Sequence, residues 1–304
     1  MGDETTVELV LSPRDEAVQS GLSDAPGWSA FVTQLRDTLR EVMVANRVDS
    51  LEVDELLVSQ PLPDRYSHLR NGVQVGPGKA IDLIVGMVDG RGPYCRLSNA
   101  EGLRVDVGWD GAMHLSMTQE AARSLTDLAG GQVQVEWRRV RPEPPNDSRP
   151  VRAAADEEFW NAVRSAAEAE LTLLCERWAH GAHGNTWFRV TPDNLTQVAG
   201  SIRPRSLVSI VVNPDLRLKV EIIDDGFAAF KAPLRPGELD SRSYFGGADS
   251  LDEVTSQGYS LMLGDSVLSR WCAVVPDPDG EVRGSWKDRE DSCALGPLSI
   301  AAWA

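Results

Sequence analysis

The sequence is poor in the residue types that mark metal sites and disulfide frameworks. It contains four cysteines and four histidines in 304 residues, and Cys95, Cys175, Cys272 and Cys293 are far apart. No pair of cysteines has the short spacing that is typical of a zinc site or of a small disulfide-rich fold. We therefore expect reduced thiols, a cytoplasmic location, and no metal or other cofactor.

Long hydrophobic runs are also missing. No apolar stretch approaches the ~18 residues that a membrane-spanning helix needs, and the segment MGDETTVELVLSPRDE has no basic region followed by an apolar one. The sequence thus predicts neither a membrane span nor a signal peptide. Lysine is rare as well, since nearly all basic residues are arginines, and this preference suggests a GC-rich bacterial genome.

Positive charge is in deficit. The chain has 30 basic and 46 acidic residues, which gives a net charge of −16 and a pI of about 4.7. The acidic excess is spread over both halves and is not gathered in a tail. Nucleic acids and anionic membranes are bound through basic surfaces. The charge therefore argues against both as partners and is first of all a source of solubility.

Hydrophobic periodicity predicts an α+β first half. We expect a loosely held acidic arm over residues 1–26 that contains one strand-like run, Thr6–Leu11. An amphipathic helix follows between Trp28 and Val42. Strands are predicted over residues 51–58, 81–88, 103–107 and 132–137. Ser116 and Gln119 form a capping box before a short helix that ends near Leu128. The predicted domain spans residues 27–140.

The second half repeats this order. A proline-rich linker is predicted over residues 141–155, and a second α+β domain over residues 156–304. This domain begins with a helix from Asp156 to Ala179 and contains a capping box from Ser250 to Glu253. Its strands are predicted over residues 186–190, 207–212, 216–223, 226–230, 259–263, 270–275 and 281–286. The fold class is thus α+β in two domains, each a helix followed by a mainly antiparallel sheet with a further helix.

Three motifs could carry chemistry, and none of them is complete. Gly72–Lys79 has one residue too many between its outer glycines for a phosphate-binding loop, and Ala80 replaces the magnesium-binding hydroxyl residue. Ser266 in Gly-Asp-Ser is similar to the nucleophile of GDSL-type hydrolases, but no histidine base follows it. His180 and His183 could share a metal with Glu176, although a helix end explains His180 better. We assign no catalytic, cofactor or metal residue and keep a hydrolase that uses Ser266 or His180 and His183 as an alternative.

One tryptophan is a candidate for partner binding. Trp109 lies in Val-Gly-Trp-Asp-Gly, a turn in which its side chain could be exposed. Exposed tryptophans often anchor protein partners. Packing of Trp109 over the sheet is the commoner alternative.

Three segments of the first half resemble a known family. The helix beginning Trp28-Ser-Ala-Phe-Val, the segment Gly92–Val107 and the segment Leu115–Ala129 occur in the order found in actinobacterial domains of the type III secretion chaperone-like (T–Y chaperone) superfamily. The resemblance covers residues 27–139. It implies a non-catalytic, chaperone-like module that masks a protein or an extended peptide and acts as a homodimer. An immunity protein against a basic toxin is the alternative within the binding class.

Overall fold

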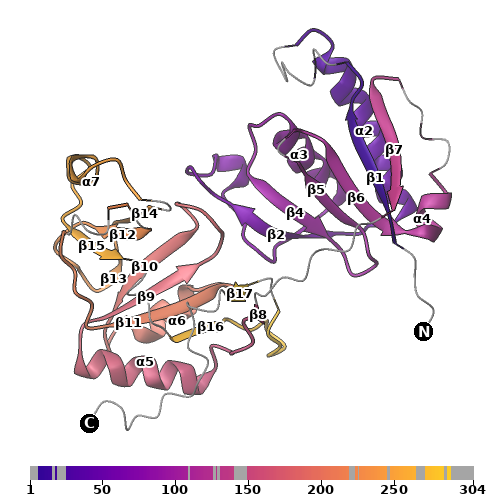
Figure 1. Cartoon of the computed structure of the whole chain (residues 1–304). Helices are drawn as coiled ribbons and strands as arrows, with labels where there is room; N and C mark the ends of the chain where they lie inside the picture. Colours follow the sequence, from indigo (N-terminus) through magenta and orange to yellow (C-terminus); the bar gives the residue numbers. More distant parts are fainter. Residues whose placement is uncertain are drawn as a thin grey trace. The chain divides into compact units, whose positions relative to one another are not determined.

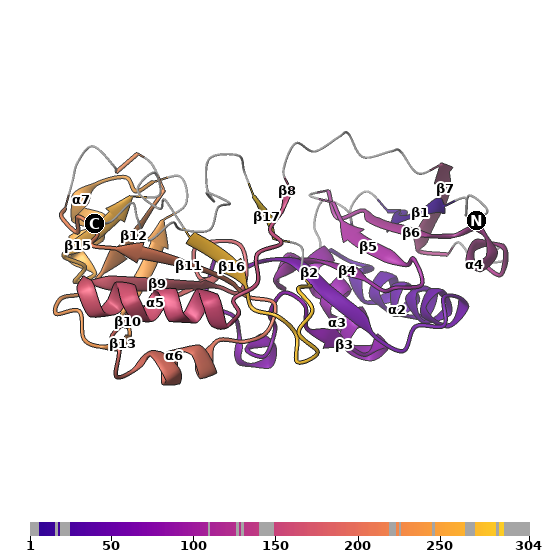
Figure 2. The same ribbon diagram turned by 90° about the horizontal axis from the view of Figure 1, so that it is seen from below.

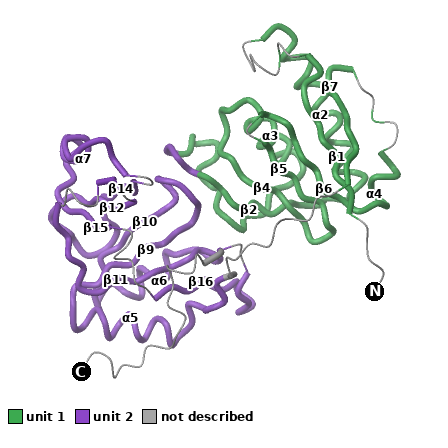
Figure 3. Tube along the Cα trace, in the orientation of Figure 1, with its two compact units in different colours: residues 1–57, 62–144 green, residues 58–61, 145–304 purple. Residues whose placement is uncertain are grey.

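The computed structural model describes residues 6–15, 18, 25–108, 110–125, 128, 131–139, 149–218, 223–224, 226–244, 247–264, 271–283 and 286–288. Within these residues the chain is a mixed α/β protein with several antiparallel sheets (Figure 1). It divides into two compact units, residues 1–57 with 62–144 and residues 58–61 with 145–304 (Figure 3). The organisation into two independent domains remains a prediction.

Unit 1 is built on a seven-stranded antiparallel sheet. The strand order is β3-β2-β4-β5-β6-β1-β7. The strands are β1 (Thr6–Pro13), β2 (Leu51–Leu57), β3 (Gln74–Val75), β4 (Tyr94–Ser98), β5 (Arg104–Val107), β6 (Met113–Thr118) and β7 (Val133–Arg139). β1 pairs with both β6 and β7. The predicted acidic arm therefore contains an inner strand, because the buried side chains of Leu9 and Leu11 hold this segment in the core.

Two helices pack on the same face of this sheet. α2 (Trp28–Ala45) and α3 (Pro77–Val88) lie side by side below the strands in Figure 2. The strand predicted over residues 81–88 is therefore wrong, since this segment forms all of α3 after its first turn. Pro77 in the first turn favours a helix start. The short apolar run that follows did not distinguish a buried helix from a buried strand, as is common for such runs.

The predicted capping box at Ser116 is also wrong. Ser116 and Met117 belong to β6, in which buried and half-buried side chains alternate. The helix that follows, α4 (Gln119–Arg123), has only five residues, and Thr118 is its N-cap because the Thr118 hydroxyl accepts a hydrogen bond from the Ala121 N–H. The Ser-x-x-Gln spacing therefore occurs here by chance.

Unit 2 has four layers. A five-stranded sheet has the order β13-β10-β9-β11-β16, a three-stranded sheet has the order β14-β12-β15, and β17 pairs with β8. The strands are β8 (Arg149–Pro150), β9 (Thr172–Arg177), β10 (Asn185–Val190), β11 (Leu207–Val212), β12 (Phe227–Phe230), β13 (Gly237–Glu238), β14 (Ser241–Tyr244), β15 (Leu261–Gly264), β16 (Trp271–Val274) and β17 (Lys287–Asp288). α5 (Glu157–Ala169) and α6 (Leu195–Ser201) cover one face of the larger sheet, the smaller sheet covers its other face, and α7 (Leu251–Ser256) lies beyond the smaller sheet.

The helix predicted from Asp156 to Ala179 is only half right. α5 begins after Asp156, whose side chain accepts a hydrogen bond from the Phe159 N–H at 3.0 Å. The chain then leaves the helix and forms β9, which lies between β10 and β11. Both faces of this central strand are covered, so Leu173, Leu174 and Cys175 are all buried. Such a continuous apolar run does not show the alternation of a half-buried strand.

The linker prediction also needs a correction. Arg149–Pro150 forms β8, and Val151 donates a backbone hydrogen bond to Trp286 at 2.9 Å. Ala155 donates one to Val274 at the same distance, and both side chains are buried. Residues 149–155 are thus packed into unit 2, and the rest of the predicted linker lies outside the described residues.

Several smaller predictions can be compared directly. The strands predicted over 51–58, 103–107, 132–137, 186–190, 207–212, 226–230, 259–263 and 270–275 are confirmed within one or two residues at most ends. The capping box at Ser250 is confirmed, because the Ser250 hydroxyl accepts a hydrogen bond from the Glu253 N–H at 3.2 Å. No strand is present at residues 216–218 or 281–283, and the remaining residues of those two predicted strands lie mostly outside the described part of the chain.

The cysteines do not all share one state. Cys95 and Cys175 are free and buried, whereas Cys272 is disulfide-bonded. The prediction of reduced thiols is thus wrong for Cys272, because cysteines that are distant in sequence can meet in the fold. Cys293 lies outside the described residues.

Candidate functional site

Two of the residues singled out by the sequence are not placed by the structure. Trp109, the candidate partner-binding residue, and Ser266, the candidate nucleophile, both lie outside the described residues. The loop Gly72–Lys79 is placed, and it leads through β3 into the first turn of α3.

His180 and His183 lie between β9 and β10 and not at the end of a helix. Their backbone groups bind Val58: the His180 carbonyl accepts from the Val58 N–H at 2.7 Å, and the His183 N–H donates to the Val58 carbonyl at 2.9 Å. Partial burial and the nearby Arg242 lower the pKa of His183. Among the described residues, no three His, Cys, Asp or Glu side chains gather in a way that could hold a metal ion. The clearest observed role of this histidine segment is thus to hold residue 58 in unit 2.

The open face of the unit 1 sheet is occupied by its own ion pairs. Arg96 binds Glu55 at 2.7 Å and Asp106 at 2.8 Å, and Arg104 binds the second oxygen of Asp106 at 2.7 Å. These residues alternate along their strands with the buried Leu97 and Val105 and therefore point away from α2 and α3. Charges that already satisfy one another make this face a weak candidate for binding.

The outer edge of β7 is a stronger candidate. β7 is seven residues long and pairs with β1 over its whole length. On its other side no strand is found among the described residues. The opposite edge of the sheet is formed by β3, which has only two residues. β7 therefore offers the longer exposed edge of unit 1 to an additional strand.

The register shows which backbone groups of β7 point outward. Opposite residues of an antiparallel pair alternate between hydrogen-bonded and non-hydrogen-bonded. The Arg14 N–H donates to the Gln132 carbonyl at 3.0 Å, just beyond the pair of Pro13 and Val133. The even-numbered residues of β7 therefore bond to β1. The N–H and C=O groups of Val133, Val135, Trp137 and Arg139 point away from β1.

Trp137 adds apolar surface to this edge. It lies opposite Leu9, so its side chain points to the face that carries the core. Leu9 is fully buried, but 41% of Trp137 is exposed. The neighbouring Glu136 and Arg138 point to the open face and bind each other at 2.7 Å. The edge thus combines backbone groups that have no strand partner among the described residues with an exposed aromatic side chain. Sequence reasoning found the strand but did not find that it lies at the edge.

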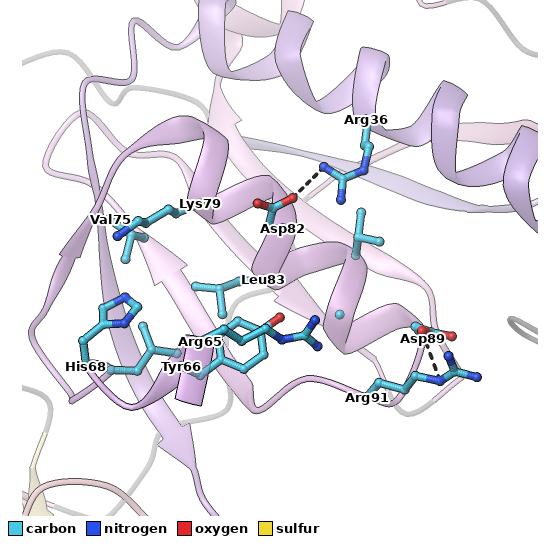
Figure 4. A pocket seen from close by; sticks show the side chains of 13 residues that line it. Arg36, Arg65, Tyr66, His68, Val75, Lys79, Asp82, Leu83, Asp89 and Arg91 are labelled. Carbon is cyan, nitrogen blue, oxygen red and sulfur yellow. Dashed lines mark hydrogen bonds and ion pairs between the residues drawn. The ribbon is translucent and has the colours of Figure 1, made fainter. Parts of the chain in front are cut away.

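A hollow beside α3 is the second candidate. Its volume is about 660 Å³, and it lies between α3, the short helix η2 (Asp64–Tyr66) and the side chain of Arg36 from α2 (Figure 4). Buried side chains form its floor, namely Tyr66, Leu69, Val75 and Leu83. Its rim carries charged side chains, among them Arg65 and Lys79. No local sequence pattern indicates this hollow, because it depends on the packing of a loop against a helix that was predicted to be a strand.

Comparison of the chain with known proteins adds no information on these sites. No family model, no curated protein and no solved structure matches the chain. The resemblance to the chaperone-like superfamily therefore stays a prediction. No helix among the described residues has the length and apolar character needed to cross a bilayer.

Proposed function

We propose that the chain is a non-catalytic binding module that takes up an extended segment of a partner protein along the outer edge of β7. The observation that carries this proposal is the outward direction of the backbone groups of Val133, Val135, Trp137 and Arg139 on a long edge strand. An added strand would form main-chain hydrogen bonds with these groups. The resemblance to chaperone-like modules supports the same type of partner.

The position of Trp137 favours an apolar side chain in the bound segment. Side chains of an added strand that point to the core face would lie beside Trp137 and continue the row that Leu9 begins. A half-exposed tryptophan at the centre of an interface is a common source of binding energy. Glu136 and Arg138 lie on the other face and limit unspecific pairing of the edge.

The proposal can be tested with peptides selected against the intact chain. A display library of random linear peptides is panned on the immobilised protein, and selected peptides are then measured by fluorescence anisotropy. Val135→Pro removes an N–H that points outward and leaves the bonds of β7 to β1 in place. We expect it to weaken peptide binding at least ~tenfold.

Glu136→Gln in the same strand is the matched control. It keeps every backbone group of the edge and changes a side chain on the other face. We expect its affinity for the peptides to stay within about twofold of the parent chain, and both variants to keep the parent circular dichroism spectrum. Peptides that bind the Val135→Pro protein as tightly as the parent would contradict the proposal, and so would a library that yields no binding peptide.

A further inference from the structure

The hollow beside α3 is positively charged although the chain as a whole is strongly acidic. Four lining side chains carry a permanent positive charge, namely Arg36, Arg65, Lys79 and Arg91, and only Asp82 and Asp89 are acidic. His68 also lines the hollow. In a chain with a net charge of −16, such a concentration of positive charge favours the binding of an anion at this hollow.

Internal pairing accounts for only part of these charges. Arg36 binds Asp82 at 2.7 Å, and Arg91 approaches Asp89 at 3.5 Å (Figure 4). Arg65 and Lys79 have no ion-pair partner among the described residues. The guanidinium of Arg65 lies over the ring of Tyr66, at 4.6 Å from its centre, and this contact holds it at the hollow. Two cations thus remain available to a ligand.

The floor of the hollow supplies a hydrogen-bond donor. Tyr66 lines the hollow and is only 8% exposed as a whole residue. Its hydroxyl lies over α3 at Gly86, where a Cβ atom would be 3.1 Å from it. The Tyr66 hydroxyl, next to the guanidinium of Arg65, is well suited to bind an oxyanion.

The other end of the hollow supplies an acceptor. Asp89 follows the last residue of α3, and its Oδ1 atom is buried without a hydrogen-bond partner in the described structure. A carboxylate at a helix C-terminus is not stabilised by the helix dipole. A ligand hydroxyl that donates to Oδ1 would satisfy it. Figure 4 shows Arg65 and Tyr66 between Lys79 at one end of the hollow and Asp89 at the other.

We infer that this hollow binds a small organic phosphate that carries hydroxyl groups. Arg65 and the Tyr66 hydroxyl hold the phosphate, Lys79 adds positive charge at one end, and Asp89 accepts a hydrogen bond from a ligand hydroxyl at the other. The volume of about 660 Å³ lies within the range of small-molecule sites. This site is separate from the β7 edge and does not depend on peptide binding there.

Titration calorimetry with the full chain tests the inference. The probes are ribose 5-phosphate and glycerol 3-phosphate. Ribose, which has the hydroxyl groups but no phosphate, and inorganic phosphate, which has no carbon-bound hydroxyl groups, are the two controls. We expect the organic phosphates to bind with a dissociation constant below about 1 mM, inorganic phosphate to bind more weakly, and ribose not to bind.

Variants assign the binding to this hollow. Combined Arg65→Gln and Lys79→Gln should weaken binding of the organic phosphates at least ~tenfold, and Tyr66→Phe, which removes only the hydroxyl, by several-fold. Asp89→Asn should reduce the preference for organic over inorganic phosphate. Arg123→Gln, an exposed arginine on α4, is the matched control and should leave binding unchanged.

Two results would overturn the inference. One is the absence of binding of both organic phosphates to the parent chain. The other is binding that Arg123→Gln weakens as much as the Arg65 and Lys79 changes do, because the effect would then reflect net charge and not this site. Thermal melting of each variant verifies that the fold is retained.

Discussion

At the scale of single residues, burial decides which side chains can react. Cys95 lies in β4, and burial, followed by the nearby Asp106 and Asp54, raises its pKa to about 12. The thiolate is the nucleophilic form of cysteine. A rise of the pKa from 9 to about 12 therefore reduces the thiolate fraction of Cys95 roughly a thousandfold at a pH below both values. The thiol is therefore protected twice, by its position and by its protonation.

This predicts the alkylation behaviour of Cys95. Iodoacetamide at pH 8 should leave Cys95 unmodified in the native chain and modify it fully after denaturation in urea. Peptide mass spectrometry with and without urea measures both states. Rapid modification of Cys95 in the folded chain would show that β4 is not buried as described.

An ion pair in unit 2 gives a second residue-scale prediction. Arg205 Nε binds both carboxylate oxygens of Asp277, at 2.9 and 3.1 Å, and Arg283 binds one of them at 3.0 Å. Burial alone would raise the pKa of Asp277, but the hydrogen bonds from the two arginines outweigh it and hold the pKa below its usual value. Because the folded state has the lower pKa, the charged form of Asp277 stabilises the fold above pH 4 or so and loses this effect as the pH falls.

Asp277→Asn should therefore destabilise the chain in a pH-dependent way. We expect the free energy of unfolding to fall by about 1–2 kcal/mol at pH 7, with a smaller difference between variant and parent at pH 3. Urea unfolding at both pH values measures it. Asp279→Asn, at an exposed carboxylate that also binds Arg283, is the matched control with a smaller expected effect. A difference that does not change with pH would contradict this account.

At the scale of elements, the turn that follows α3 folds back on the helix at two glycines, and the Gly92 N–H donates a hydrogen bond to the Gly86 carbonyl at 2.8 Å. A Cβ atom on Gly92 would lie 2.8 Å from the carbonyl carbon of Gly86 and 3.1 Å from its Cα. These are backbone atoms that cannot move aside easily. Gly78, near the start of the same helix, has open space around it.

We therefore expect opposite results for two alanine substitutions. Gly92→Ala should lower the free energy of unfolding by about 1–3 kcal/mol, because the turn must move away from the helix. Gly78→Ala should be neutral or slightly stabilising, because alanine favours the helix. Chemical denaturation followed by circular dichroism compares them. Equal effects of the two changes would show that the contact between Gly92 and Gly86 is looser than described.

The helices and strands also show which parts of the fold can be predicted from the sequence. Strands with one buried face, such as β5 and β7, were predicted from their alternation, and the Ser250 cap from its spacing. The errors fall on α3 and β9, where an apolar run is covered on several sides and carries no period. The β7 edge and the hollow were not predicted, because both depend on which segments become neighbours in space. Local sequence patterns do not determine the order of strands in a sheet.

At the scale of the whole molecule, both proposed sites lie in unit 1. The predicted two-domain organisation can be tested at the segment that connects the units. Since residues 149–155 are packed into unit 2, we expect a broad-specificity protease under native conditions to cut first within residues 140–148, at the proline-rich segment. Mass spectrometry of the fragments should show two stable halves. First cuts inside the strands of either unit would contradict a two-domain organisation.

Amide hydrogen exchange on the full chain tests whether a peptide adds to the outer edge of β7. The exchange of individual amides is followed by NMR with and without a bound peptide. We expect that binding newly protects the N–H groups of Val133, Val135, Trp137 and Arg139, whereas those of Gln134, Glu136 and Arg138 change little because they already bond to β1. Protection that appears elsewhere in the chain, with no alternation along β7, would contradict it.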